Sequence, residues 1–266
     1  MKNILDKIIE HKKIEIARCR QERTATELMQ SHGFERNTLS LKSSLLDISK
    51  TGIIAEFKRR SPSKGIINAS ADVAKVTSVY TQYGASCLSV LTDEQFFGGS
   101  LEDLKIARQH AIPILRKDFM IDEYQILEAR AFGADVILLI AACLSPRRVK
   151  ELAAYAKKLS LEVLLEVHGE DELAHVCDEI DLVGVNNRNL KTFEVDIENS
   201  IRLLNILPKN KLAIAESGID NVKVVKQLRT AGFSGFLIGE NFMKNENPGE
   251  AFKNYVQQLK QVENEN

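Results

Sequence analysis

The sequence is poor in features that cross-link or anchor a chain. It has only 4 cysteines, which lie far apart and form no Cys-x-x-Cys pair. This spacing disfavours both a structural zinc site and a disulfide framework, so we interpret the cysteines as reduced, small apolar residues. They are Cys19, Cys87, Cys143 and Cys177.

The sequence also lacks long hydrophobic runs and any excess of charge. The N-terminal stretch MKNILDKIIEHKKIEIARCR is interrupted by charge every few positions, which fits neither a secretory signal nor a membrane span. The formal net charge is −1, which excludes a generally basic surface that binds nucleic acid by charge alone but allows a local anion site. We therefore expect a cytoplasmic protein with no membrane partner and no nucleic-acid partner.

What the sequence does contain is a series of eight short runs rich in Ile, Val and Leu, separated by segments with helical periodicity. Apolar strands that alternate with helices are typical of a parallel sheet covered by helices, and eight such units close a TIM barrel. A barrel of about 250 residues would use nearly the whole chain. We therefore predict a single α/β domain over residues 1–266, a (β/α)8 TIM barrel. The predicted strands span 53–57, 87–91, 112–115, 136–140, 163–167, 182–185, 212–215 and 236–238.

The segments between the strands carry apolar residues at three- and four-residue spacing, which predicts outer helices. Several end in a glycine before the next strand, and a left-handed stop fits Gly84, Gly133 and Gly232. Residues 1–47 indicate a charged helix and a second short helical stretch, an N-terminal extension of a barrel in 48–266. Whether this extension only packs on the barrel or also helps to close its mouth is left open. The predicted helices span 72–83, 101–110, 123–132, 146–159 and 221–231.

Polar and charged side chains recur at the C-terminal ends of the predicted strands, where barrels of this kind carry their chemistry. A single one would by default form a surface ion pair, but their repetition from strand to strand indicates a catalytic site. Glu56 and Lys58 alternate in an extended segment and so point to the same face. The set is Glu56, Lys58, Lys117, Glu166, Asn186, Arg188, Glu216 and Ser217.

Two glycines after the last two predicted strands indicate an anion site. Gly218 lies in the run AESGID, and Gly239 lies in the run FLIGENF. Backbone amides freed by these glycines suit a phosphate monoester, and the loops after strands seven and eight are its usual place in this fold. Ser61 can add a hydroxyl. The alternative is that both glycines serve only as tight turns.

Seven motifs follow one another along the chain: EFKRRSPSKG, LTDEQFFGGS, ILRKDFMID, LLEVH, VGVNNRNL, IAESGI and FLIGENFM. In order and spacing they resemble the indole-3-glycerol-phosphate synthase family over almost the whole chain. The resemblance implies conversion of 1-(2-carboxyphenylamino)-1-deoxyribulose 5-phosphate, a small phosphorylated substrate, into indole-3-glycerol phosphate, with release of carbon dioxide and water in tryptophan biosynthesis. It leaves open an association with other tryptophan-pathway enzymes.

The resemblance also implies that no metal and no organic cofactor takes part. The sequence carries no nucleotide-binding fingerprint, and His168 and Glu170 near Glu166 lack the His-Glu-x-x-His spacing of a zinc site.

The resemblance implies roles for the charged set. Lys117 is the general acid for ring closure, and Glu166 is the catalytic carboxylate. Lys58 holds the substrate carboxylate and is a candidate for dehydration, and Glu56 is the other acid–base candidate. Which lysine serves which step stays open. Substrate hydroxyls and charged side chains would be oriented by Asn186, Arg188, Glu216 and Ser217.

The substrate's ring needs an apolar wall, and by resemblance that wall is formed by Phe96 or Phe97, with Phe119, Leu138 and Phe193. Glu240 departs from the small hydroxyl residue that some relatives carry after Gly239. A carboxylate would repel a phosphate, so we expect only its backbone N–H to face the phosphate, with the side chain turned away.

Two alternatives remain open. One keeps the barrel and its phosphate site but uses Lys117 or Lys58 as a Schiff-base nucleophile, as an aldolase does. The other is a catalytically silent barrel that binds a phosphorylated metabolite or packs against a pathway enzyme. Loss of Lys117 or Glu166 would favour the silent barrel, and both are present.

Overall fold

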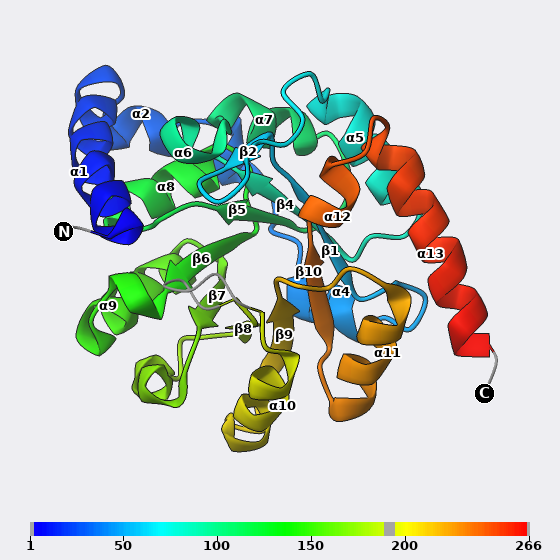
Figure 1. Ribbon diagram of the computed structural model, residues 1–266. Helices are drawn as coiled ribbons and strands as arrows, with labels where there is room; N and C mark the ends of the chain where they lie inside the picture. Colours follow the sequence, from blue (N-terminus) through cyan, green and yellow to red (C-terminus); the bar gives the residue numbers. More distant parts are fainter. Residues whose placement is uncertain (1–2, 189–194, 265–266) are drawn as a thin grey trace.

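The computed structural model describes residues 3–188 and 195–264. Within these residues eight parallel strands close into a barrel, in the order β1-β10-β9-β8-β7-β6-β5-β4, and helices surround the ring (Figure 1). The predicted TIM barrel is therefore confirmed. The strands are β1 (Ile53–Phe57), β4 (Cys87–Leu91), β5 (Ile114–Lys117), β6 (Val136–Ile140), β7 (Glu162–Val167), β8 (Leu182–Asn186), β9 (Leu212–Glu216) and β10 (Gly235–Ile238).

The barrel strands are mostly apolar because both of their faces are buried. Ile54 belongs to the cluster inside the barrel, whereas its neighbours Ile53 and Ala55 belong to the layer beneath the helices. Side chains two residues apart share a face. Glu56 therefore points to the inside with Ile54, as Lys117 does with Leu115. The same alternation carries the other strand-end side chains of the predicted site into the barrel.

The outer helices begin and end within a few residues of the predicted ranges. Gly84, Gly133 and Gly232 follow their helices with positive φ of 89°, 96° and 116°, as the left-handed stop requires. The predicted helices appear as α5 (Val73–Gln82), α7 (Leu101–Ala107), α8 (Glu123–Ala131), α9 (Pro146–Lys158) and α11 (Val222–Ala231). Two further helices cover the barrel, α10 (Ile197–Ile206) and α13 (Pro248–Asn264).

Short elements decorate the loops that follow the strands. A two-stranded hairpin of β2 (Arg60–Ser61) and β3 (Gly65–Ile66) follows β1. Short helices follow β4 and β10, and two 3-10 turns follow β6 and β7. These are α6 (Glu94–Phe97), α12 (Glu240–Met243), η1 (Ala141–Cys143) and η2 (Glu170–His175).

The residues before β1 form four helices, where the sequence predicted one helix and a second short stretch. Along the first, Ile8 and Ile16 are buried, whereas Ile14 is 70% exposed. The last of the four carries Leu41 into the cluster inside the barrel, so it closes the end opposite the strands' C-terminal ends. They are α1 (Ile4–Glu22), α2 (Ala25–Met29), α3 (His32–Glu35) and α4 (Leu41–Leu46).

Within residues 3–188 and 195–264, no helix is both long enough and apolar enough to cross a membrane.

Candidate active site

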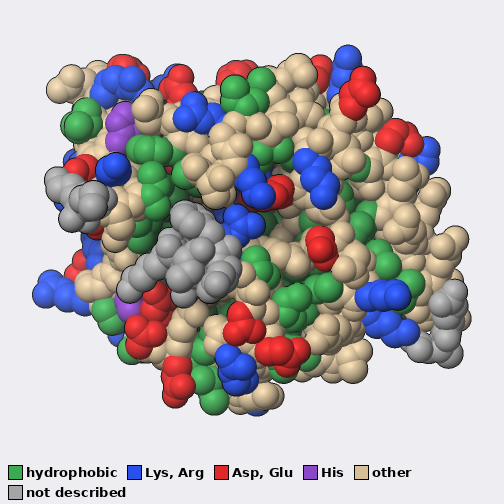
Figure 2. Space-filling model, viewed as in Figure 1, with side chains coloured by type: hydrophobic (Ala, Val, Ile, Leu, Met, Phe, Trp, Pro, Cys, Tyr) green, Lys and Arg blue, Asp and Glu red, His purple; other side chains and the backbone are tan. Residues whose placement is uncertain are grey.

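A cavity of about 1200 Å³ opens at the C-terminal ends of the strands, and Asn3, Ile4 and Ile8 at the start of α1 line part of it. On the face shown in Figure 2, Lys and Arg side chains gather with Asp and Glu side chains around the central hollow. The sequence-predicted residues that line the cavity are Glu56, Lys58, Ser61, Phe97, Lys117, Phe119, Leu138, Glu166, Asn186, Arg188, Glu216, Ser217, Gly218, Gly239 and Glu240. Phe193 lies outside the described residues.

Lys117, the last residue of β5, lies between two carboxylates inside the barrel. Its Nζ is 3.5 Å from Glu166 Oε2 and 3.7 Å from Glu216 Oε2. Burial alone would lower the pKa of Lys117, but the neighbouring carboxylates raise it above its usual range. Lys117 is thus a cation that can donate a proton or a hydrogen bond. An amine nucleophile needs a lowered pKa, so this environment argues against the Schiff-base alternative at Lys117.

The two carboxylates around Lys117 have opposite shifts. For Glu166 burial alone would raise the pKa, but Lys117 and His168 outweigh it and hold the pKa well below its usual value. For Glu216 burial and the nearby Glu166 raise the pKa to about 8. Glu166 is therefore ionised at neutral pH while Glu216 retains a proton. Carboxyl groups whose pKa values are pushed apart in this way are typical of acid–base sites.

Gly184 in β8 makes room for the Glu216 carboxyl group. A Cβ at this position would lie 2.1 Å from Glu216 Oε1, a distance that no real contact allows. Sequence reasoning missed this residue. A glycine inside a strand signals a close approach of another group, and that was the available clue.

Glu56 and Lys58, which were predicted to point to the same face, form an ion pair with Lys58 Nζ 2.7 Å from Glu56 Oε1. Burial alone would raise the pKa of Glu56, but Lys58 and Lys117 together lower it. Glu56 also fills the space beside Gly239, where a Cβ would lie 2.4 Å from Glu56 Oε1. The lack of a side chain at Gly239 therefore lets the Glu56 side chain pack closely. This packing is independent of any ligand that the Gly239 backbone amide binds.

The backbone turns sharply after β9 through Ser217 and Gly218, which have φ of 67° and 68°. Ser217 is one of few non-glycine residues with positive φ, a conformation that costs about 1–3 kcal/mol and clusters at functional sites. The buried Asn187 supports this turn, because its Nδ2 donates to the Ser217 carbonyl at 2.7 Å. Sequence reasoning also missed Asn187. The available clue was the pair Asn186–Asn187 directly after the predicted strand 182–185.

Glu240 lines the cavity with its side chain between two cations. Its carboxylate oxygens lie 3.7 Å from Lys64 Nζ and 3.7 Å from Arg188 Nη2. Lys64 and Arg188 therefore offset the negative charge of the Glu240 carboxylate, which was expected to repel a bound phosphate.

Phe97 and Phe119 form a tilted aromatic pair, with ring centroids 5.9 Å apart, and both line the cavity together with Leu138. Phe96 instead packs edge-on against His11 of α1 at 5.7 Å. Of the two neighbouring phenylalanines, it is therefore Phe97 that lines the cavity.

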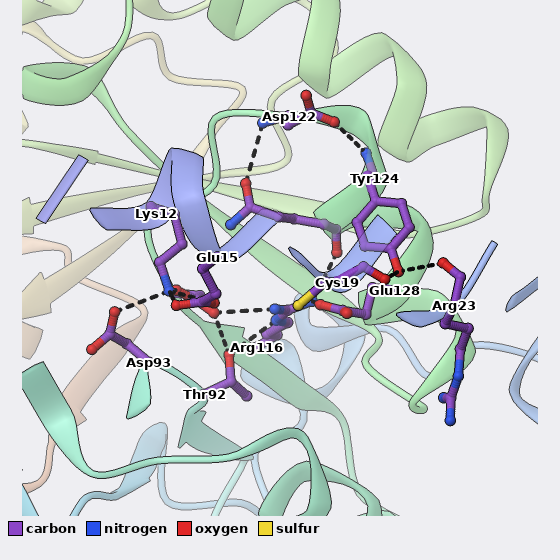
Figure 3. Close-up of polar contacts among 12 residues, drawn as sticks. Lys12, Glu15, Cys19, Arg23, Thr92, Asp93, Arg116, Asp122, Tyr124 and Glu128 are labelled. Carbon is purple, nitrogen blue, oxygen red and sulfur yellow. Dashed lines mark hydrogen bonds and ion pairs between the residues drawn. The ribbon is translucent and has the colours of Figure 1, made fainter. Parts of the chain in front are cut away.

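Lys12 anchors α1 to the loops that carry this wall (Figure 3). Its side chain is 0% exposed, and its Nζ lies 2.9 Å from Asp93, from Asp118 and from Glu15. Asp93 caps α6, which ends at Phe97, and Asp118 directly follows Lys117.

Lys12 was missed in the sequence because lysine is a surface residue by default. The clue was its place in the buried stripe of α1, four residues after Ile8 and four before Ile16.

His168 also belongs to the site, although the sequence analysis named it only when testing for a zinc site. Its Nε2 lies 3.2 Å from Glu166 Oε1. Across the described part of the chain, no group of three or more His, Cys, Asp or Glu side chains is arranged to hold a metal ion.

Comparison with known proteins gives consistent matches. The family model described as indole-3-glycerol phosphate synthase matches residues 5–255. The chain is 49% identical over 260 residues to the indole-3-glycerol phosphate synthase of Bacteroides thetaiotaomicron, covering 97% of this chain and 100% of that protein. It is 46% identical over 256 residues to the protein of the same name from Polaromonas sp., covering 94% and 97%.

Solved structures match at the level of the fold. The tryptophan synthase alpha subunit of Legionella pneumophila superposes with a TM-score of 0.63 at 12% identity, covering 85% of this chain and 98% of that one. The 3-hexulose-6-phosphate synthase of Salmonella typhimurium gives a TM-score of 0.62 at 12% identity, covering 79% and 98%. At such identities the likeness concerns the fold alone.

Proposed function

The chain belongs to the indole-3-glycerol phosphate synthase family, and from that membership we propose how its own residues share the reaction. The protein is a carboxy-lyase of tryptophan biosynthesis. It closes the ring of 1-(2-carboxyphenylamino)-1-deoxyribulose 5-phosphate, releases carbon dioxide and water, and forms indole-3-glycerol phosphate. The fold supports a division into an N-terminal extension, 1–47, and a barrel, 48–266, within one domain.

Lys117 is the general acid of ring closure. Attack by the aromatic ring on the ketone carbon develops negative charge on the carbonyl oxygen, which a positioned cation stabilises and protonates. The observation that supports this role is the place of Lys117 Nζ at the cavity, 3.5 Å from Glu166 and 3.7 Å from Glu216. Loss of carbon dioxide then restores the aromatic ring.

Dehydration needs an acid for the leaving hydroxyl and a base for the proton released as the indole double bond forms. Lys58, in its ion pair with Glu56, is the acid, and Lys58 also holds the substrate carboxylate. Glu166 is the base, because its lowered pKa keeps it ionised. Glu56 stabilises the charge on Lys58.

The remaining residues bind and orient the substrate. Backbone amides at Gly218, Gly239 and Glu240, with the Ser61 hydroxyl, bind the phosphate. The side chains that orient the hydroxyls and charged groups are Asn186, Arg188, Glu216 and Ser217. The substrate's ring packs on Phe97, Phe119 and Leu138, and Phe193 remains a proposed part of this wall from outside the described residues. The reaction proceeds without metal or organic cofactor.

The protein acts in the cytoplasm and associates there with other enzymes of tryptophan biosynthesis. Co-purification of a tagged chain from cells that lack tryptophan tests the association, because a chain recovered alone would contradict it.

A steady-state assay tests the assignment of Lys117. With substrate and a chelator present, indole fluorescence should appear for the wild type and fall about 100-fold to 10,000-fold for Lys117→Ala. Lys105→Ala, an exposed position on α7, is the matched control and should keep wild-type turnover. Near-normal turnover of a folded Lys117→Ala variant would remove Lys117 from the mechanism.

A further inference from the structure

His168 follows β7 and lies between two carboxylates at the edge of the cavity. Its Nε2 forms an ion pair with Glu166 Oε1 at 3.2 Å, and its Nδ1 lies 3.3 Å from Glu172 Oε2. The side chain is only 14% exposed, and its backbone N–H donates to the same Glu172 oxygen at 2.7 Å. A neutral imidazole would direct a lone pair at one of these carboxylates, whereas an imidazolium offers a proton to both. The contacts therefore select the charged ring.

The two oxygens of Glu166 have different surroundings. Oε1 accepts a hydrogen bond from Asn186 Nδ2 at 3.1 Å and also faces His168. Oε2 faces Lys117 at 3.5 Å. Oε1 is thus held by one hydrogen bond and one ion pair, whereas Oε2 faces the proposed general acid.

We propose that His168 is a positioning residue of the reaction: as an imidazolium fixed by Glu172, it holds Oε1 of Glu166 and leaves Oε2 as the reactive oxygen. The proposal rests on the role given to Glu166 above. His168 acts through Glu166 and not on the substrate. The sequence motifs gave no indication that His168 positions Glu166.

The charges around the pair support this arrangement. Burial alone would lower the pKa of His168, but Glu166 and Glu172 raise it to about 10, so the ring stays charged at neutral pH. Glu166 meets Lys117 from β5 and the uncharged Asn186 from β8, and its neighbours include Glu216 of β9 and Glu56 of β1. The half-buried Cys143 after β6 has a raised pKa and stays a neutral thiol. His168 is thus the second cation, beside Lys117, that holds Glu166 ionised.

The first test measures protonation and does not depend on activity. Nitrogen NMR of the full chain, labelled at histidine, should show both ring nitrogens of His168 protonated at neutral pH. Glu172→Gln should lower the pKa of His168 by about 1 unit or more, since an opposite charge within contact distance shifts a pKa by about that amount. A wild-type His168 that is neutral at pH 7, with one protonated nitrogen, would overturn the proposal even if Glu166 is catalytic.

The second test measures turnover. His168→Gln should lower kcat by about 10-fold to 100-fold, as expected when a residue that orients a reacting group is removed, with little change in KM. Glu172→Gln should lower kcat in the same direction, and the double variant should lose no more than His168→Gln alone.

The matched control is His175→Gln. Its ring nitrogens lie 2.9 Å from the carbonyls of Glu172 and Leu144, away from the cavity, so kcat should not change. Wild-type kcat in His168→Gln, or equal losses in both variants, would give His168 a structural role only. If His168→Gln does not fold, the NMR titration of the wild type still decides.

Discussion

At the residue scale, the site is built from groups whose protonation states are set by their neighbours. Glu166 and Glu216 both face Lys117, yet the pKa of Glu166 is lowered and that of Glu216 is raised to about 8. The difference arises because Glu166 has His168 and Asn186 on its far side, whereas Glu216 Oε1 is buried without a hydrogen-bond partner among the described residues.

Glu166→Gln should lower turnover much more than substrate affinity, because the isosteric amide keeps the hydrogen bonds but cannot take up a proton. We expect kcat to fall by about 100-fold or more with KM nearly unchanged. Steady-state kinetics with Glu162→Gln as a control, a glutamate at the opposite end of the same strand, measures both. A variant that mainly raised KM would make Glu166 a binding residue.

Glu216→Gln should stabilise the protein in a pH-dependent way. The folded-state pKa of about 8 lies above the ordinary value of 4.5, so between these values the folded state holds a proton that the unfolded state has released. Stability from this group is therefore lost as pH rises from about 4.5 to about 8. The difference in free energy of unfolding, variant minus wild type, should grow over this window by up to about 5 kcal/mol, since one pKa unit corresponds to about 1.4 kcal/mol. Urea melts that show a constant or shrinking difference would contradict the raised pKa.

Sequence reasoning predicted site residues that end strands and missed those that support them. Lys117 and Glu216 could be predicted because strand ends in a barrel share one mouth. Gly184 and Asn187 carried only general clues in the sequence, because their roles depend on a neighbouring strand that the alternation of apolar residues does not identify. His168 needed the positions of Glu166 and Glu172 before its charge could be inferred.

At the element scale, α1 is attached to the site by a buried cation. Lys12 joins α1 to the loops after β4 and β5, and the same loops carry Phe97 and Phe119. Helix α1 therefore belongs to the wall of the cavity. This favours the role in which the N-terminal extension helps to close the mouth of the barrel over the role of packing alone.

Lys12→Met should destabilise the protein by about 3–5 kcal/mol, because Asp93 would stay buried without its cation and Asp118 would keep only Arg116. Lys13→Met, at the adjacent exposed position, is the control and should change stability by less than about 0.5 kcal/mol. Equilibrium unfolding in urea measures both. Equal stabilities of the two variants would show that the buried ion pairs do not anchor α1.

Elements with continuous apolar runs were predicted well, and elements defined by tertiary contacts were not. The third strand was expected at 112–115 but begins at Ile114. Ile112 donates to the His110 carbonyl in a turn, and Pro113 has no N–H for a strand ladder. Helices α10 and α13 were not among the predicted helices, although both have amphipathic sequences, and the β2–β3 hairpin is too short for periodicity to reveal.

At the scale of the whole molecule, buried ion pairs make the free energy of unfolding depend on pH in the acidic range. Asp118 and Glu166 have folded-state pKa values below their ordinary values of 3.8 and 4.5, because nearby cations outweigh the effect of burial. The unfolded state therefore binds more protons in acid, and the stability that these groups provide is lost as pH falls below about 4.5.

Thermal melting between about pH 6 and pH 3 should show this loss. Asp118→Asn should reduce the slope, because the amide cannot be protonated while Lys12 keeps Asp93 and Glu15 as partners. A slope unchanged by Asp118→Asn would show that other carboxylates control unfolding in acid.

The order of chemical steps provides the most direct test of Lys117. Substrate labelled in its carboxylate carbon would be mixed with excess Lys117→Ala enzyme, and carbon dioxide and indole would be followed together in a single turnover. If Lys117 is the acid of ring closure, both should appear about 100-fold to 10,000-fold more slowly than with wild type, since decarboxylation must follow closure. Carbon dioxide released at the wild-type rate without indole would instead place Lys117 in the dehydration step and contradict its assigned role.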